Sequence, residues 1–225
     1  MRRTTQFFLA TAAATIPFTQ LPGATAAPKA WPKAAAPKSV VGQLQRARTA
    51  PPAAAATLLS EVMQQARARK DTALLELAGH IALSRGVEAR DKGDLAGAKA
   101  LLVRGLSALN EVVPGSEHVA YCLLNLGQLV DEQGQTAAAE KYLRRSLAVY
   151  QIVGADTPRL ANCLESLGST LQKLGKHREA AKLLERAVGI YETAEPDSPA
   201  LARALARLLT GAHHPGVRFD SSRLR

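Results

Sequence analysis

Histidine and cysteine are the residues of this chain best suited to bind a metal or to act as nucleophiles. The five histidines are His80, His118, His177 and the neighbours His213 and His214. No HExxH pattern joins them, and Cys122 and Cys163 lie far apart in the sequence instead of forming a Cys-x-x-Cys pair. The sequence therefore predicts no metal site, no cofactor and no catalytic residue, and we do not expect an enzyme.

Binding of nucleic acid would require a basic surface on the folded part of the chain. The segment 1–60 contains seven Lys and Arg and no acidic residue, so most of the formal net charge of +10 lies there. The rest of the chain is close to neutral and lacks the footprint that phosphate binding needs. We therefore do not expect nucleic acid as the main partner. The alternative, an RNA-associated protein, would act through the basic leader or tail.

The two cysteines are equivalent positions of a repeat, and this repeat supplies the elements that must position any site. The offset in sequence between Cys122 and Cys163 also separates the members of three sets of small residues. They are Gly86, Gly127 and Gly168; Gly93, Gly134 and Gly175; and Ala98, Ala139 and Ala180. A fixed period in this range is typical of a solenoid built from copies of one unit.

One unit, residues 118–150, has the pattern of a helical hairpin. Its first helix carries an apolar stripe, and Gly127 lies within that stripe. A glycine in mid-helix costs about 1 kcal/mol relative to alanine, so Gly127 indicates close approach of the second helix. Gly134 is the expected C-cap of the first helix, and Thr136 the expected N-cap of the second. Ala139 is then the small residue that meets the first helix.

This pattern resembles the tetratricopeptide repeat (TPR), with structural repeat positions at Gly86, Ala98, Gly127, Ala139, Gly168 and Ala180. The long period and the GADTPRLANCLESLG segment between copies are most similar to the kinesin-light-chain type of this repeat. The resemblance covers roughly residues 75–211. It implies an all-α fold, a right-handed superhelical solenoid of antiparallel helix pairs with about three TPR units plus capping helices.

In the resembled family the first helices line a concave groove that binds proteins. Carried over to this chain, the groove positions are Tyr121, Leu124, Gln128, Asp131 and Glu132 in the second copy, Asn162, Glu165, Ser169, Gln172 and Lys173 in the third, and His80, Leu83, Val87, Arg90 and Asp91 in the first. Their mixed polarity, with Tyr121 and Leu124 exposed, favours a peptide or a helix as the ligand. Leu83 and Leu124 replace the lysine of the chaperone-tail clamp, which argues against recognition of a carboxylate tail.

Composition divides the chain into three parts. Residues 1–56 are expected to be a targeting segment followed by an extended linker rich in Ala, Pro and Lys. Residues 57–211 form the helical repeat domain, with a capping helix from Thr57, a first helix that starts at Asp71 and a closing helix over residues 198–209. Residues 212–225 are a flexible basic tail. Trp31, in the linker, is the one tryptophan and could contact a partner.

Two targeting signals fit the N-terminal segment. Arg2 and Arg3, an apolar stretch over residues 7–18 and the Ala24-Thr25-Ala26 sequence suit a signal peptide cleaved after Ala26. The acid-free composition continues to residue 60, which is more typical of an organellar transit region. Residues 7–18 are too few to span a bilayer, so no transmembrane segment is predicted. We favour the mitochondrial matrix, with secretion or the periplasm as the alternative.

The sequence thus favours a non-catalytic scaffold for protein partners, an accessory subunit or assembly factor of a larger mitochondrial complex. The alternatives are an RNA-associated component of an organellar ribosome or RNA-processing complex, and a secreted or periplasmic TPR adaptor. The sequence gives no indication of the oligomeric state.

Overall fold

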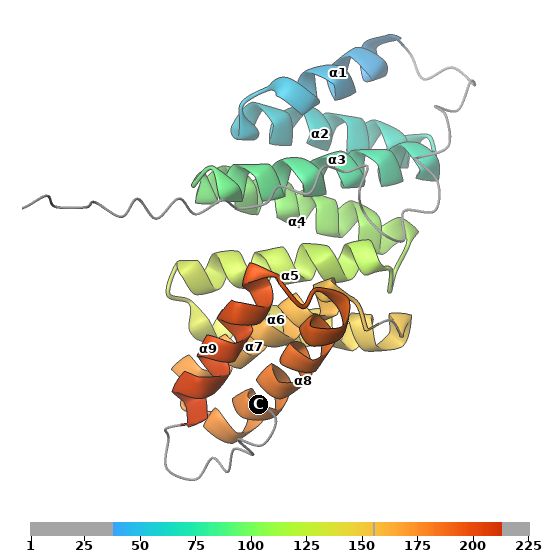
Figure 1. Ribbon diagram of the computed structural model, residues 1–225. Coiled ribbons are helices and arrows are strands. Elements are labelled where there is room, and N and C mark those ends of the chain that lie inside the picture. Colours follow the sequence, from blue (N-terminus) through green and yellow to red (C-terminus); the bar gives the residue numbers. More distant parts are fainter. Residues whose placement is uncertain (1–37, 155, 213–225) are drawn as a thin grey trace, which may run out of the picture.

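The structure, a computed structural model, describes residues 38–154 and 156–212, which form helices joined by short turns (Figure 1). The helices are α1 Lys38–Thr49, α2 Pro52–Ala68, α3 Thr72–Asp91, α4 Leu95–Val112, α5 Glu117–Glu132, α6 Thr136–Val153, α7 Pro158–Lys173, α8 His177–Ala194 and α9 Pro199–Ala212. Over these ranges the chain contains no strand. No helix among them is both long enough and apolar enough to span a membrane.

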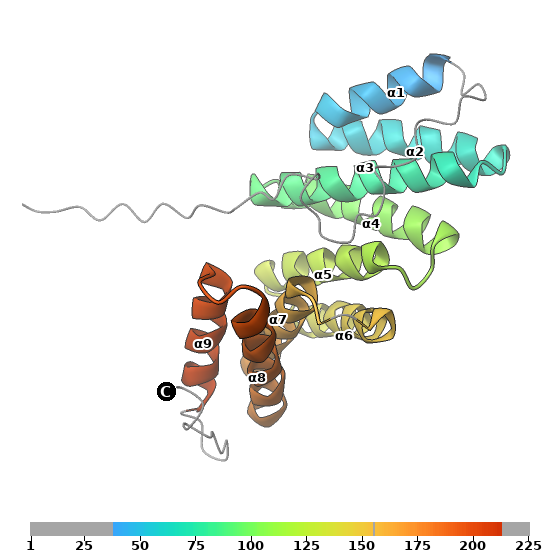
Figure 2. The same ribbon diagram turned by 45° about the vertical axis from the view of Figure 1, so that its right-hand side comes forward.

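Successive helices stack side by side into a curved array, as the two views in Figures 1 and 2 show. Each helix packs mainly against the helices that precede and follow it in sequence, and α3, α5, α7 and α9 also contact one another in that order. This arrangement is an all-α solenoid of helical hairpins, as the sequence predicts.

The period of the sequence repeat is kept in the helix bounds themselves. The second helices α4, α6 and α8 begin at the evenly spaced positions 95, 136 and 177, and each has 18 residues. The first helices start at side-chain caps; Asp71, for example, accepts a hydrogen bond of 2.9 Å from the backbone N–H of Leu74. The predicted start at Asp71 is therefore confirmed.

The turn between α5 and α6 differs in two details from the expectation. The predicted C-cap is off by one residue: Gln133 is the C-cap, and Gly134 follows it with a left-handed backbone, φ +77°, which favours glycine. The predicted cap at Thr136 is wrong. The backbone N–H of Gln135 already donates to the carbonyl of Val130, at 2.9 Å, and closes the turn. Thr136 is therefore the first helical residue, and Gln135 occupies the N-cap without a side-chain hydrogen bond.

The repeat glycines allow the two helices of each hairpin to pack closely. A Cβ atom added to Gly86, Gly127 or Gly168 would lie 2.7, 2.6 or 2.8 Å from the Cγ of a leucine in the second helix. These leucines are Leu102, Leu143 and Leu184. The repeat alanines Ala98, Ala139 and Ala180 are fully buried. The close approach inferred from the glycines is thus confirmed in all three copies.

We expect Ala139→Leu to destabilise the chain, because the added side-chain atoms have no space in this fully buried contact. Overpacking of this kind typically costs about 1 to 3 kcal/mol. Urea unfolding would measure the loss. Ala137→Leu, at an exposed position of the same helix, is the matched control and should change stability little. Equal midpoints for Ala139→Leu and the unmodified chain would contradict the close contact.

The array begins earlier than predicted. The sequence predicts an extended linker over residues 38–49, but they form α1, which buries Val40, Leu44 and Ala47 against the array. These residues are spaced four and three apart, so they share one helix face. The prolines of this region lie outside α1 and do not interrupt it. The helical array therefore starts at Lys38 and not at Thr57.

The last helix closes the array and covers its apolar end. Ala204 and Leu208 of α9 are buried, whereas Leu209 remains 43% exposed. The closing helix predicted over residues 198–209 is observed, and it extends to Ala212. The targeting predictions on residues 1–37, Trp31 included, and the tail from residue 213 lie outside the described residues.

Candidate functional site

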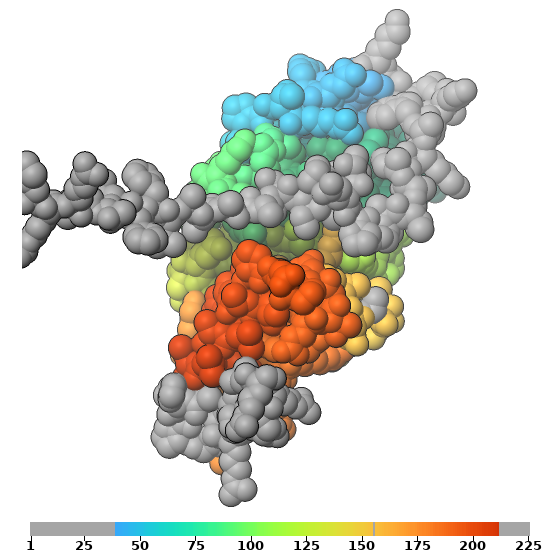
Figure 3. Space-filling model, viewed as in Figure 1, coloured from blue at the N-terminus to red at the C-terminus, as the bar shows by residue number. Residues whose placement is uncertain are grey.

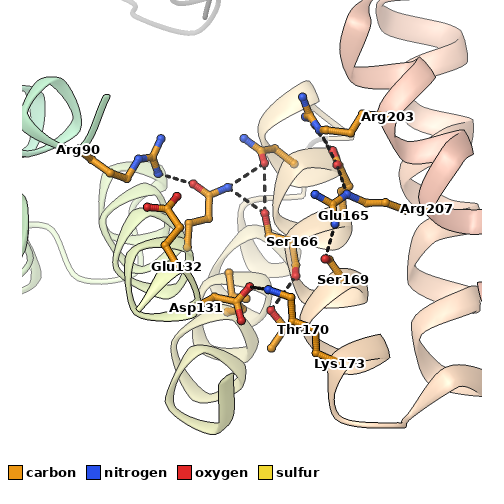
Figure 4. Close-up of a pocket in the computed structure, with 13 residues that line it drawn as sticks. Arg90, Asp131, Glu132, Glu165, Ser166, Ser169, Thr170, Lys173, Arg203 and Arg207 are labelled. Carbon is orange, nitrogen blue, oxygen red and sulfur yellow. Dashed lines mark hydrogen bonds and ion pairs between the residues drawn. The ribbon is translucent and has the colours of Figure 1, made fainter. Parts of the chain in front are cut away.

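A polar hollow with a volume of about 480 Å³ opens on the side of the array formed by the first helices (Figure 4). It is lined by Arg90 of α3, Gln128, Asp131 and Glu132 of α5, Leu143 of α6, Asn162, Glu165, Ser166, Ser169, Thr170 and Lys173 of α7, and Arg203 and Arg207 of α9. The space-filling view in Figure 3 shows α9 on the surface beside the more N-terminal helices. Eight of the fifteen predicted groove residues line this hollow: Arg90, Gln128, Asp131, Glu132, Asn162, Glu165, Ser169 and Lys173.

Hydrogen bonds between side chains join three first helices along one wall of the hollow. Arg90 Nη1 donates to Asn125 Oδ1 at 2.8 Å and also to Gln128 Oε1. Gln128 Nε2 in turn donates to Asn162 Oδ1 at 3.0 Å and to Ser166 Oγ at 2.8 Å. The wall is therefore fixed from α3 through α5 to α7 before any ligand binds.

Ion pairs fix the opposite wall. Arg203 Nε and Arg207 Nε lie 2.6 and 3.0 Å from Glu165 Oε1, and this carboxylate is only 3% exposed. The bond to Glu165 raises the pKa of the Arg203 guanidinium. Lys173 Nζ lies 2.7 Å from Asp131 Oδ2 and links α7 to α5.

Among the carboxylates that line the hollow, Glu132 is the one available to a binding partner. It is exposed, and it makes no hydrogen bond or ion pair with a residue that the structure describes, whereas Asp131 is held by Lys173. In Figure 4 the Glu132 side chain lies on the side of the hollow, with no dashed line to it. A charge change at Glu132 can therefore test the site without breaking an ion pair.

The two predicted groove leucines are not exposed, which corrects the sequence analysis. Leu124 is fully buried and Leu83 is 5% exposed. Glu165 occupies the same repeat position one copy later and binds the arginines of the next first helix. We infer that this position faces the following first helix in every copy. An aliphatic side chain is therefore buried there, and neither leucine can contact a ligand in the groove.

The remaining predicted residues lie outside the hollow. Asp91 pairs with Arg90 at 3.3 Å, and Gln172 Nε2 donates to the backbone carbonyl of Arg207 at 2.9 Å. Val87 is half-buried and packs against the core. These contacts join neighbouring turns and helices, so the predicted residues do not form one continuous surface.

His80 and Tyr121, the last two predicted residues, lie in the N-terminal halves of α3 and α5. The His80 ring packs edge-to-face on His118 with 4.3 Å between the ring centroids. Tyr121 lies under the guanidinium of Arg159, which is 4.9 Å from the ring centroid. Both are partly buried in the junctions between first helices.

The sequence analysis missed the contribution of α9. Arg203 and Arg207 lie one full repeat period after Asn162 and Ser166, two residues that also line the hollow. Extension of the repeat register into the closing helix would have placed both arginines on the groove side. Ser166 and Thr170, which also line the hollow, were missed as well.

The two thiols are unsuited to nucleophilic chemistry. Burial raises the pKa of Cys122 to about 12 and that of Cys163 to about 11, so both thiols stay protonated near neutral pH. Both cysteines are free and buried. Within residues 38–154 and 156–212 no group of three His, Cys, Asp or Glu side chains is arranged to hold a metal ion. What the hollow offers is a rigid set of hydrogen-bonding and charged groups.

Comparison with known proteins agrees with this architecture. The family model described as Tetratricopeptide repeat matches residues 81–152 and 139–193, which together span just over half of the chain. A crystal structure of kinesin light chain nearly identical TPR-like repeats from Podosopora anserina is similar with a TM-score of 0.52 and 19% sequence identity. The match covers 77% of this chain and 85% of that one. No curated protein sequence matches the chain. The resemblance to repeats of the kinesin-light-chain type is thus confirmed.

Proposed function

Because this chain belongs to the tetratricopeptide repeat family, whose repeats serve as scaffolds for protein–protein interaction, we propose that it is a non-catalytic accessory subunit or assembly factor of a larger mitochondrial complex. The hollow formed by α3, α5, α7 and α9 is the observation that carries this proposal. A protein segment of the partner binds there, in contact with side chains from four successive first helices.

The fixed lining favours binding. Gln128 is held by two acceptors from α7, and Glu165 is held by two arginines from α9. Because these side chains are already ordered in the free chain, little conformational entropy is lost when a partner docks. A polar lining of this kind is suited to a segment that brings its own hydrogen-bonding groups.

The N-terminal composition supports a targeting segment, and the helices that follow limit which residues can belong to it. Residues 38–49 belong to α1 and residues 52–60 to α2, so we expect a removable leader to lie within residues 1–37. The acid-free stretch continues into these helices, so its length no longer favours import into an organelle over secretion. Arg2, Arg3 and the absence of acidic residues remain in favour of a targeting segment.

The location is tested by mass spectrometry of the mature N-terminus after expression in the native cell, combined with fractionation. We expect a start between residues 28 and 38, together with recovery in the mitochondrial fraction as part of a larger complex. A start at Ala27 in a secreted or periplasmic fraction would overturn the location. RNA in the purified complex, bound with a steep dependence on salt, would support the RNA alternative.

The binding site is tested with Glu132→Lys, because this exposed carboxylate has no partner among the described residues. Affinity for the purified partner should fall at least tenfold. Like charges or lost hydrogen bonds in a docked interface weaken the binding free energy by more than about 1.4 kcal/mol, which corresponds to a factor of ten in affinity. Glu192→Lys, an exposed position on α8, is the matched control with the same charge change. Equal affinities for both variants and the unmodified chain would place the partner elsewhere.

A further inference from the structure

Successive first helices meet in their N-terminal halves through the same three repeat positions. At the junction of α5 with α7 these positions hold Glu117, Tyr121 and Arg159. At the junction of α3 with α5, one repeat earlier, they hold Glu76, His80 and His118. A comparison of the two junctions shows what the histidines replace.

The junction of α5 with α7 contains a permanent cation. The guanidinium of Arg159 lies 4.9 Å from the ring centroid of Tyr121, and its Nη1 lies 3.0 Å from Glu117 Oε1. An arginine stays charged at every pH that a cell reaches. The cation–π contact and the ion pair therefore hold these two helices together independently of pH in the neutral and mildly acidic range.

The junction of α3 with α5 has no permanent charge at the equivalent ring positions. The rings of His80 and His118 meet edge-to-face, with an interplanar angle of 86° and 4.3 Å between centroids. His80 Nε2 lies 3.6 Å from Glu76 Oε1. Two neutral imidazoles pack well in this geometry, whereas two imidazolium rings at this separation repel each other strongly.

The charges around the pair come from three helices. Glu76 of α3 and Glu117 of α5 favour protonation, and Arg159 of α7 opposes it at His118. The helices α1, α2, α4 and α6, which also pack on α3 or α5, supply none of the charges that shift these pKa values most. Burial is the largest cause, and it lowers the pKa of both histidines; the charge on His80 lowers the pKa of His118 further.

We propose that the junction of α3 with α5 is a pH-sensitive joint of the scaffold, closed while His80 and His118 are neutral and loosened when they take up protons. The neighbouring junction of α5 with α7, fixed by Arg159, does not respond. Since α3 and α5 each present residues to the concave side, loosening would separate Arg90 from its partners Asn125 and Gln128. This inference stands on the geometry of the junction and does not require the proposed mitochondrial role.

The direction of the effect follows from the two lowered pKa values. In the unfolded chain each histidine titrates near its ordinary value of about 6.5, and in the closed joint each titrates below it. The open or unfolded state therefore binds more protons as the pH falls. The stabilising effect of the closed joint is complete above about pH 6.5 and is lost progressively as the pH falls towards the pKa values of the closed state.

Hydrogen–deuterium exchange of the full chain at pH 7.5 and pH 5.5, corrected for the intrinsic pH dependence of exchange, tests the joint. We expect the amides of α3 and α5 that face each other to exchange severalfold faster at the lower pH, because the open state takes up protons that the closed joint disfavours. The amides of α7 and α8 serve as an internal control and should change little. Equal changes in both regions would overturn the proposal.

The double variant His80→Tyr with His118→Arg copies the residues of the pH-independent junction into the pH-sensitive one. We expect this variant to lose the acid response of α3 and α5 while its exchange at pH 7.5 is unchanged or slower. His177→Gln, at the start of α8, removes a histidine elsewhere and should keep the response. A folded double variant that retains the full acid response would overturn the proposal.

Should the double variant fail to fold, the unmodified chain still decides the question. An NMR titration of the histidine ring protons should show two coupled transitions for His80 and His118, both below 6.5. Two independent transitions at or above 6.5 would overturn the proposal, because the histidines of the closed joint would then bind protons as readily as those of the open state.

Discussion

Replacement of Arg203 and Arg207 by methionine is expected to release α9 from the end of the array. Glu165 would remain, 3% exposed, without either cation that holds it. Removal of one side of a buried ion pair costs about 3 to 5 kcal/mol, and the half-exposed arginines place this case at the lower end. Hydrogen–deuterium exchange should show loss of protection over residues 199–212, while α3 to α6 stay protected because each hairpin contacts only its neighbours.

The same replacement in a Glu165→Leu background separates the ion pair from the packing of α9. Leucine is the residue found at the equivalent positions 83 and 124, where it is buried. Since a buried ion pair can often be replaced by apolar residues at little cost, the triple variant should recover most of the protection of α9. Equal loss in the double and triple variants would show that the arginines act through something other than Glu165.

Gly127→Val is the second change with a large expected effect. The new Cβ would lie 2.6 Å from the Cγ of Leu143, and the branched side chain adds two further methyl groups at the same contact. We expect a loss of about 3 kcal/mol, at the top of the usual range for overpacking, measured by urea unfolding. Because the central hairpin joins the two ends of the array, α3 and α8 should then lose their cooperative unfolding.

Gly189→Val is the matched control for this prediction. Gly189 also lies within a helix, but apart from its chain neighbours and the backbone of its own helix no atom comes within 4 Å of the position of its Cβ. Valine is a slightly better helix former than glycine, so this variant should be as stable as the unmodified chain or slightly more stable. Similar losses for both variants would contradict the role of the contact with Leu143.

The repeat itself could be predicted from the sequence because every copy packs its two helices in the same way and therefore needs the same residue types at the same spacing. Gly127 and Ala139 are small where two helices touch, and the same demand returns in every copy at the same spacing. A period of that length appears in the sequence without any knowledge of the three-dimensional structure. The helix α1 was missed because its Ala, Pro and Lys surroundings suggested a linker, although Val40, Leu44 and Ala47 already share one helix face.

The site was predicted less completely because its polarity depends on pairs formed between copies. Nothing in residues 162–173 alone shows that Glu165 is buried, since its burial follows from arginines that lie 38 and 42 residues later. Leu124 looked like an exposed groove residue for the same reason: the next first helix, which covers it, is absent from a single copy. Positions that face the following copy can be assigned only when at least two copies are aligned in space.

The exposed leucine of α9 determines how far such an array can grow. Leu209 occupies the repeat position that holds Gly127 and Gly168 in the two preceding first helices. A second helix needs a residue without a side chain there in order to pack as α8 does on α7, so the leucine blocks that approach sterically. Neither a further hairpin nor the corresponding helix of another copy can continue the stack in the same geometry. The leucine therefore closes this packing geometry at α9.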